Sequence, residues 1–206
     1  RRRRHDLRRV PHDGASVGID FGLKKYMTMS DGTEIDNPQF LKSDLVELRR
    51  KSRNLSKCKK GSNNRKRKRL ELDRLYNDIS NRKSDFQWKL AHFLCRKYDN
   101  IFLEDLNLKG MSKRWGRKMS DLAHGDFVSK LEYVALKYGC IVHKIDRFYP
   151  SSRLCTCGYK NDALSLRDRV WTCPECGAVH PRDLFAAQNI LRQGIVEYKS
   201  KCKTDL

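Results

Sequence analysis

Residues 15–22 read Ala-Ser-Val-Gly-Ile-Asp-Phe-Gly, a short apolar run that carries one acidic side chain, Asp20. A second strand is predicted over 26–30 and a third over 33–36. The two are joined by an Asp-Gly dipeptide, which is a strong signal for a two-residue hairpin turn. The segment 15–36 therefore predicts an antiparallel meander of three strands.

The rest of the chain extends this meander into a mixed fold. Apolar residues recur at helical spacing through 39–97, which predicts a long helical hairpin. A fourth strand is expected over 100–106, a helix over 121–138, a fifth strand over 140–145 and a last helix over 183–191. A hairpin that feeds a mixed sheet with helices on its faces predicts an α/β fold of the RNase H-like type.

Charge indicates the class of partner. The 206 residues include 45 Lys and Arg against 25 Asp and Glu, a formal net charge of +20. Such an excess favours a polyanion, and nucleic acid is the default partner, although a merely solvated surface is the plainer alternative. No apolar run approaches the roughly 20 residues of a membrane span, and no signal peptide is visible. We therefore expect an intracellular protein that is neither secreted nor in a membrane.

The positive charge is concentrated in the N-terminal arginines and in two internal segments. Eight of the thirteen residues 57–69, at the tip of the predicted hairpin, are basic, and the loop 109–118 is also basic. Phosphate contact is expected at both, with a solvated loop as the alternative. Trp115 could stack on a base, although packing is the commoner role of a Trp. The predicted nucleic-acid contacts are Lys57, Lys59, Lys60, Arg65, Lys66, Arg67, Lys68, Arg69, Lys113, Arg114 and Arg117.

Four of the eight cysteines fall within 22 residues. Cys155 and Cys157 form one pair, and Cys173 and Cys176 form a second pair fifteen residues later. Two short cysteine knuckles at this separation predict a tetrahedral structural zinc site. Two disulfides in a secreted protein are the alternative, which the absence of an export signal disfavours. The first pair has one intervening residue where a standard knuckle has two, so its turn is tighter.

Three carboxylates fall where such a fold could bring them together. Asp20 lies in the first strand, Glu104 at the end of the fourth and Asp183 at the start of the last helix. Clustered carboxylates repel one another unless cations neutralise them, and Mg²⁺ prefers oxygen ligands. Two Mg²⁺ ions at such a site would support phosphodiester hydrolysis. Each acid alone also has a plain structural explanation, and Asp105 competes with Glu104 for the inward position.

Five strings that occur in order carry a family resemblance. They are Gly-Ile-Asp-Phe-Gly at 18–22, Phe-Leu-Glu-Asp-Leu-Asn at 102–107, Phe-Tyr-Pro-Ser-Ser at 148–152, Trp-Thr-Cys-Pro-Glu-Cys-Gly at 171–177 and Arg-Asp-x-x-Ala-Ala-x-Asn-Ile at 182–190. Together they closely resemble the C-terminal half of TnpB, the transposon-encoded OrfB family related to compact type V CRISPR effectors. The resemblance covers roughly 15–195.

The resemblance implies a RuvC-like nuclease domain with an inserted zinc ribbon, which cleaves DNA under the direction of a guide RNA. It implies that Asp20, Glu104 and Asp183 are catalytic and that the four clustered cysteines hold zinc. The implied division is a basic linker or tail of a missing domain over 1–14, the nuclease domain over 15–148 and 181–195, the ribbon over 149–180 and a tail over 196–206.

Several features depart from the family pattern. Pro181 stands where the family usually has Asp, Phe185 stands where it has Asn, and the first knuckle is Cys-x-Cys. The N-terminal half of the family is also absent, and the chain begins without Met, so we expect a further N-terminal part in a full-length protein. These departures leave open a nucleic-acid-binding regulator that does not cut, or a truncated remnant of a transposon protein.

Overall fold

The computed structural model describes residues 14–106, 113, 116, 121–165 and 167–204. At its centre is a mixed sheet of five strands in the order β3-β2-β1-β4-β5. The strands are β1 (Ser16–Phe21), β2 (Lys25–Met29), β3 (Glu34–Asp36), β4 (Asn100–Glu104) and β5 (Ile141–Ile145). The predicted α/β class is confirmed at this level.

The meander predicted at the start of the chain is confirmed. β1 pairs with β2, and β2 with β3, both antiparallel. The turn between β2 and β3 is stabilised by Asp31, whose carboxylate accepts a hydrogen bond of 2.9 Å from the Thr33 amide. Gly32 in the same turn adopts a φ of 86°. β4 then joins β1 in parallel, and β5 joins β4 in parallel.

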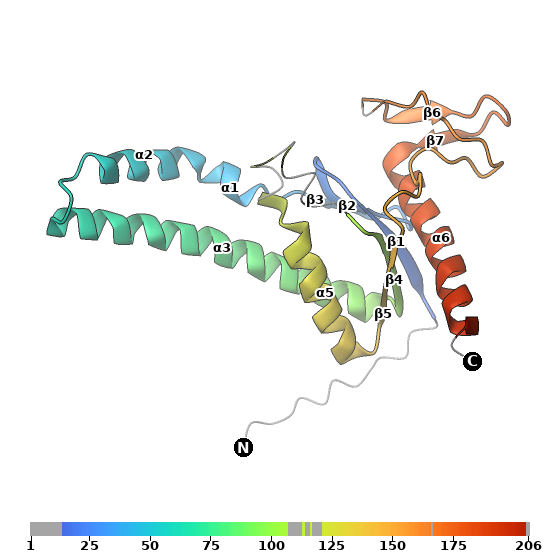
Figure 1. Cartoon of the computed structure of the whole chain (residues 1–206), viewed down its shortest axis with the longest axis horizontal. Coiled ribbons are helices and arrows are strands. Elements are labelled where there is room, and N and C mark those ends of the chain that lie inside the picture. The colour runs from blue at the N-terminus through green and yellow to red at the C-terminus, as the bar shows by residue number, and fades with distance from the viewer. Residues whose placement is uncertain (1–13, 107–112, 114–115, 117–120, 166, 205–206) are drawn as a thin grey trace, which may run out of the picture.

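Helices cover both faces of the sheet (Figure 1). The C-terminal half of α3 (Asn63–Lys97) and α5 (His124–Tyr138) bury one face in the main apolar core. Gly139, at a φ of 71°, caps α5 directly after the predicted helix end at residue 138. The helix α6 (Arg182–Thr204) packs on the opposite face, and it continues far beyond residue 191, where the predicted last helix ended.

Close packing of α6 on β1 depends on one glycine. A Cβ atom at Gly18 would lie 2.1 Å from the carbonyl oxygen of Ala187 and 2.6 Å from the amide nitrogen of Leu191. Both atoms belong to the α6 backbone, so no side-chain rotation could relieve the contact. The absence of a side chain at Gly18 thus sets how near α6 lies to the sheet.

A helical hairpin projects from this α/β body, as predicted (Figure 1). It comprises α1 (Phe40–Ser43), α2 (Leu45–Ser56) and the N-terminal half of α3. A small apolar cluster that includes Leu48, Leu72 and Ile79 holds its two arms together. A second sheet of two antiparallel strands, β6 (Val170–Thr172) and β7 (Val179–Pro181), precedes α6. Among the helices described, none is both long enough and apolar enough to cross a membrane.

Candidate functional site

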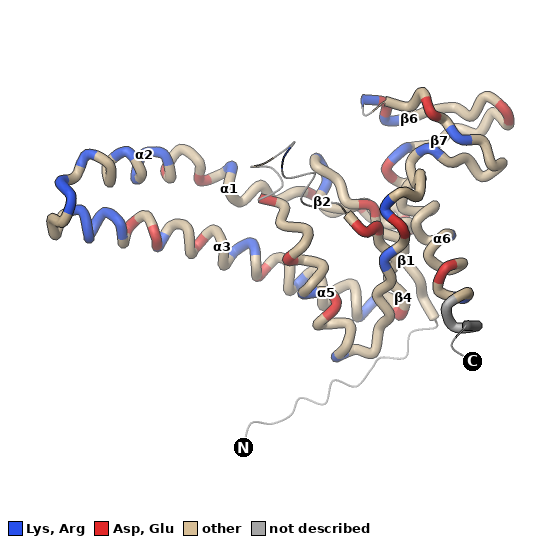
Figure 2. Tube along the Cα trace, in the orientation of Figure 1, with Lys and Arg blue, Asp and Glu red and all other residues tan. Residues whose placement is uncertain are grey.

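The three predicted acids share one cavity. β1 and β4 run in parallel with Ile19 opposite Leu103. The residues that follow, Asp20 and Glu104, therefore lie side by side near the C-terminal ends of these neighbouring strands. Asp183 lies in the first turn of α6, which packs across β1. All three side chains line a cavity of about 900 Å³. In Figure 2 acidic segments in red meet near the label of β1.

The environment of this cavity disfavours the ionised form of the Asp20 and Glu104 carboxyl groups. Burial, followed by the charges of Asp183 and Glu104, raises the pKa of Asp20 to about 8. Burial, followed by the charge of Asp105, raises the pKa of Glu104 to about 7. Carboxylates that would lose protons only near neutral pH are poised to accept a neutralising cation.

The position of Asp105 distinguishes it from Glu104. Its carboxylate forms an ion pair with the guanidinium of Arg147, whereas Glu104 faces the cavity that Asp20 and Asp183 line. Strand alternation alone could not make this distinction, because both acids sit where β4 ends.

Basic side chains share the cavity with the acids. Arg147, Arg153, Arg169 and Arg182 all line it. Arg169, from the segment just before β6, donates to Asp183 across 3.0 Å. Sequence reasoning assigned no role to these arginines, because they are spread through 147–182 and only Arg182 belongs to one of the five quoted strings. Their positive charge makes the cavity suitable for a phosphate group beside the carboxylates.

The four clustered cysteines form a compact centre that could hold a metal ion. Their sulfur atoms all lie within 4.8 Å of one another. The Sγ atoms of Cys155 and Cys176 are 3.5 Å apart, and those of Cys157 and Cys173 are 3.6 Å apart. Metal–sulfur bonds of roughly 2.3 Å in a tetrahedron place the sulfurs roughly 3.8 Å apart. The donor set therefore fits one tetrahedral ion, despite the short first knuckle.

A neighbouring histidine, which sequence reasoning missed, supports this centre. The Nε2 atom of His180 lies 3.1 Å from the Sγ atom of Cys155. Burial raises the pKa of the Cys155 thiol, but hydrogen bonds from the Cys157 amide and from His180 outweigh it and lower that pKa to about 5. A thiolate is the form that binds a metal.

Phe185, one of the departures noted above, packs into this same region. Its ring stacks on His180 with centroids 3.8 Å apart, and Trp171 lies beside both rings. Phe185 is buried in the apolar cluster that contains Cys155 and Cys173. The Phe185 ring thus packs against the cysteine centre.

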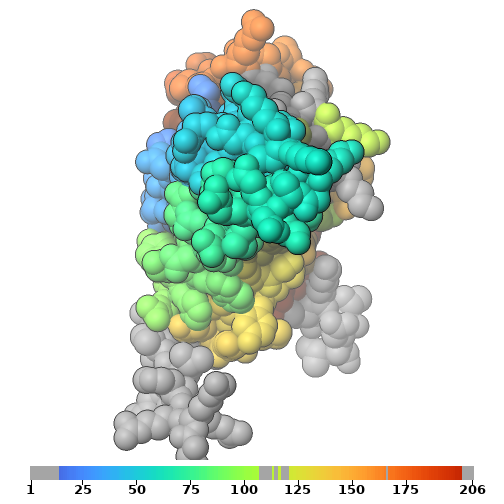
Figure 3. All heavy atoms as spheres, turned by 90° about the vertical axis from the view of Figure 1, so that its left-hand side faces the viewer, coloured from blue at the N-terminus to red at the C-terminus, as the bar shows by residue number. Residues whose placement is uncertain are grey.

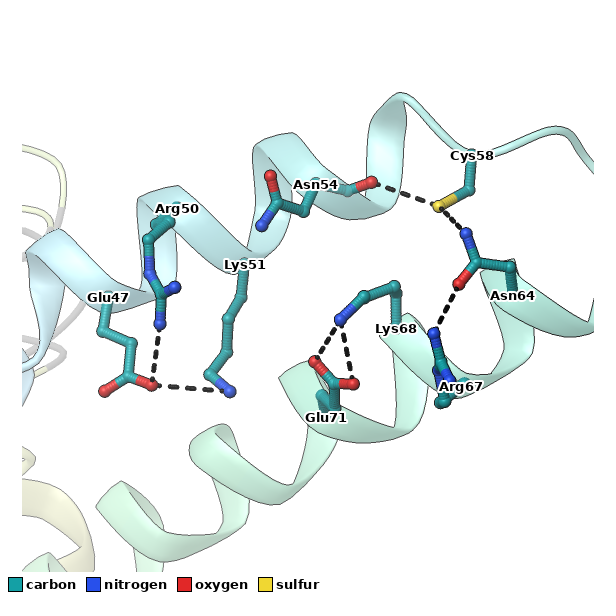
Figure 4. A network of polar contacts seen from close by, with 9 residues as sticks. All are labelled: Glu47, Arg50, Lys51, Asn54, Cys58, Asn64, Arg67, Lys68 and Glu71. Carbon is teal, nitrogen blue, oxygen red and sulfur yellow. Dashed lines mark hydrogen bonds and ion pairs between the residues drawn. The ribbon is translucent and has the colours of Figure 1, made fainter.

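The basic tip of the hairpin uses some of its charges internally (Figure 4). The guanidinium of Arg65 donates to the carbonyl oxygens of Leu55 and Cys58 at 3.0 and 3.2 Å, which caps the C-terminal end of α2. Lys68 pairs with Glu71 at 2.9 Å. Arg65 and Lys68 are thus half-buried and engaged within the hairpin.

The remaining six basic residues of the tip are exposed, although Arg67 donates to the Asn64 side chain and Arg69 pairs with Asp73. The side chains of Lys57, Lys59, Lys60 and Lys66 are exposed and have no carboxylate partner within the described residues. Figure 2 shows that Lys and Arg positions, in blue, gather along the chain at the free end of α2 and α3. In the second predicted contact region, Lys113 is exposed. Arg114, Trp115 and Arg117 lie outside the described residues.

Comparison with known proteins identifies the family. The model of OrfB_IS605, described as a probable transposase, matches residues 3–114, more than half of the chain. The chain belongs to this family. A second model, the TNB domain of Cas12f1-like proteins, matches the following part of this OrfB_IS605 member, residues 124–190.

Two curated relatives carry the words "Putative RNA-guided DNA endonuclease" in their names. The protein from Streptomyces pristinaespiralis is 41% identical over 90% of this chain and 47% of its own length. The one from Mycobacterium tuberculosis strain H37Rv is 32% identical over 92% of this chain and 44% of its own length. This OrfB_IS605 chain therefore spans a little under half the length of these relatives.

Solved structures share the fold of this OrfB_IS605 chain. A Cas12f1 protein, solved in complex with sgRNA and target DNA, superposes with a TM-score of 0.59 at 16% identity. The match covers 88% of this chain and 50% of that one. At this identity the likeness concerns the fold alone.

Proposed function

We propose that this chain is the nuclease portion of an RNA-guided DNA endonuclease and that it hydrolyses phosphodiester bonds with Mg²⁺. The observation that carries the proposal is the convergence of Asp20, Glu104 and Asp183 on one cavity in a chain of net charge +20. Membership of the OrfB_IS605 family and the names of the curated relatives support it. The strand order β3-β2-β1-β4-β5 suits an RNase H-like, RuvC-type domain.

The carboxylates would hold the metal, and the arginines would hold the strand. Three carboxyl groups that lie close together offer the oxygen donors that Mg²⁺ prefers. When bound, the ion would lower the pKa of an attacking water and stabilise the leaving oxygen. Arg147, Arg153 and Arg182 face the same cavity, where they would bind the phosphates that flank the cut.

The cysteine centre would hold structural zinc. Four thiolates at tetrahedral spacing are the donor set that zinc prefers. We propose that 149–180 forms a zinc ribbon between two parts of the nuclease domain, 15–148 and 181–195. Because α6 begins directly after β7, the folding of the ribbon would position Asp183.

DNA and a guide RNA are the proposed partners, inside the cell. Guide pairing reads sequence in such effectors, while the protein grips the backbone, and the exposed lysines of the hairpin tip suit that role. A further N-terminal part would contribute other contacts in a full-length protein.

A cleavage assay tests the proposal. The chain is incubated with labelled single-stranded DNA and Mg²⁺, beside Asp20→Ala, Glu104→Ala and the matched control Asp105→Ala. We expect cleavage by the wild-type chain and the control, and loss of cleavage in the other two variants. Cleavage that persists in Asp20→Ala, or that is lost equally in Asp105→Ala, would contradict the assignment.

A further inference from the structure

The C-terminal half of α3 carries a groove that the proposed cutting does not use. Its volume is about 600 Å³, and it shares no lining residue with the acidic cavity. We call it the aromatic groove; its lining residues are Trp88, Lys89, His92, Phe93, Arg96 and Lys97.

Rings and cations alternate along this groove. Residues four apart lie on the same side of a helix, about 6 Å from one another along the axis. One row therefore reads Trp88, His92 and Arg96, and the row beside it begins at Lys89 and passes through Phe93. No acidic side chain lines the groove in the part of the chain that the structure describes. The groove thus combines flat rings with positive charge.

The rings are accessible, and they continue onto α5. Phe93 is 42% exposed. Trp88 packs edge-on against Tyr133 with centroids 5.7 Å apart, and Tyr133 is itself 51% exposed. The ammonium of Lys137 lies 4.4 Å from the centroid of the Tyr133 ring. Figure 3 shows the C-terminal half of α3, in green, beside α5, in yellow, on one face of the molecule.

Nearby acids neutralise only part of this charge. Asp85 pairs with Lys89 at 2.7 Å, and Asp31 pairs with Lys97 at 2.9 Å. Arg96 donates to the hydroxyl of Tyr138 at 3.3 Å and has no carboxylate partner among the described residues. A partner with negative charge and flat faces would satisfy both parts of the surface.

We propose that the aromatic groove binds single-stranded nucleic acid. Bases would stack on the rings of Phe93 and the half-exposed Trp88, while a phosphate would meet Arg96. Every base offers a π face, so this recognition tolerates many sequences, as in other proteins that combine aromatic and basic side chains. The base faces of a duplex are already stacked on one another, so a duplex would gain only the attraction between its phosphates and the basic side chains. The inference does not rest on the proposed cutting.

Binding is measured on the 206-residue chain without added Mg²⁺, so that no cleavage takes place, and without a chelator, because a chelator would remove zinc from the cysteine centre. The probes are an unstructured, fluorescein-labelled RNA of 15 nucleotides, DNA of the same sequence and the corresponding duplex DNA. We expect Phe93→Ala to weaken single-strand binding about tenfold, because stacking on one ring typically carries that much, and to leave duplex binding unchanged. Arg96→Glu should weaken both. Lys42→Glu, an exposed residue of α1, is the charge control and should change binding by less than about twofold.

A second measurement locates the contact. Trp171 is buried, so in a Trp115→Phe background Trp88 is the only half-exposed Trp, and its fluorescence should be quenched when the single strand binds. Single-strand affinity that is unchanged in Phe93→Ala, with no quenching, would overturn the proposal. Self-association that is lost in Phe93→Ala would instead assign the groove to a second copy. The RNA and DNA arms decide which strand is preferred.

Discussion

Replacement of Asp20 by Asn should stabilise the metal-free protein at neutral pH. The cavity raises the pKa of this carboxyl from its ordinary value of 3.8 to about 8, chiefly through burial and then through Asp183 and Glu104. In the unfolded chain the carboxyl ionises near pH 4, whereas in the folded chain it stays protonated until near pH 8. Its contribution to the free energy of unfolding therefore falls as the pH rises from about 4 to 8. The amide of Asn carries no such charge.

The magnitude follows from the size of that rise. One pKa unit corresponds to about 1.4 kcal/mol, so a rise of about four units sets a ceiling near 6 kcal/mol. Asp20 is half-buried rather than sealed from water, which reduces the effect. We expect the variant to exceed the wild type by about 2–3 kcal/mol at pH 8 and by less than about 1 kcal/mol at pH 5.

Urea unfolding at both pH values, without added Mg²⁺ and without a chelator that would extract zinc from the cysteine centre, measures this difference. Asp73→Asn, at an exposed position on α3, serves as the control and should shift stability by less than about 0.5 kcal/mol at either pH. Adding Mg²⁺ should stabilise the wild type alone and narrow the gap, because only the wild-type site would bind the ion. A variant that is no more stable than the wild type at pH 8 without metal would refute the account of crowded carboxylates.

Three further outcomes are expected. Gly18→Ala should lower the free energy of unfolding by about 3 kcal/mol in urea titrations, because the new methyl group would lie 2.1 Å from the Ala187 carbonyl oxygen; an unchanged midpoint would contradict the packing described. Cys173→Ser should remove bound zinc, measured as metal per protein by mass spectrometry, and retention of one equivalent would argue against the four-cysteine centre. Arg65→Ala should speed hydrogen exchange at the end of α2, at a cost of about 1–2 kcal/mol, whereas Lys66→Ala should not.

Sequence patterns predicted the elements better than their contacts. Alternation and the Asp-Gly turn predicted the meander, and the spacing of the cysteines predicted their meeting, because both depend on neighbours in sequence. Glu104 lines the cavity, whereas Asp105 pairs with Arg147, which lies 42 residues further along the chain. Likewise, nothing local to Arg65 indicated that it caps α2 instead of facing solvent.

The departure at Phe185 illustrates the same limit. In the sequence it is one of the departures that leave open a nucleic-acid-binding protein that does not cut. In the structure the ring stacks on His180 and adjoins Trp171, beside the cysteine centre. Only the arrangement of β7 and the first turn of α6 reveals that environment.

The most direct test of the central claim is a titration of the chain with Mg²⁺ or Mn²⁺ by calorimetry. If Asp20, Glu104 and Asp183 form one metal site, the wild-type chain and Asp105→Asn should bind the ion, and Asp20→Asn should not. Equal binding by all three proteins, or no binding by any of them at millimolar metal, would contradict the claim.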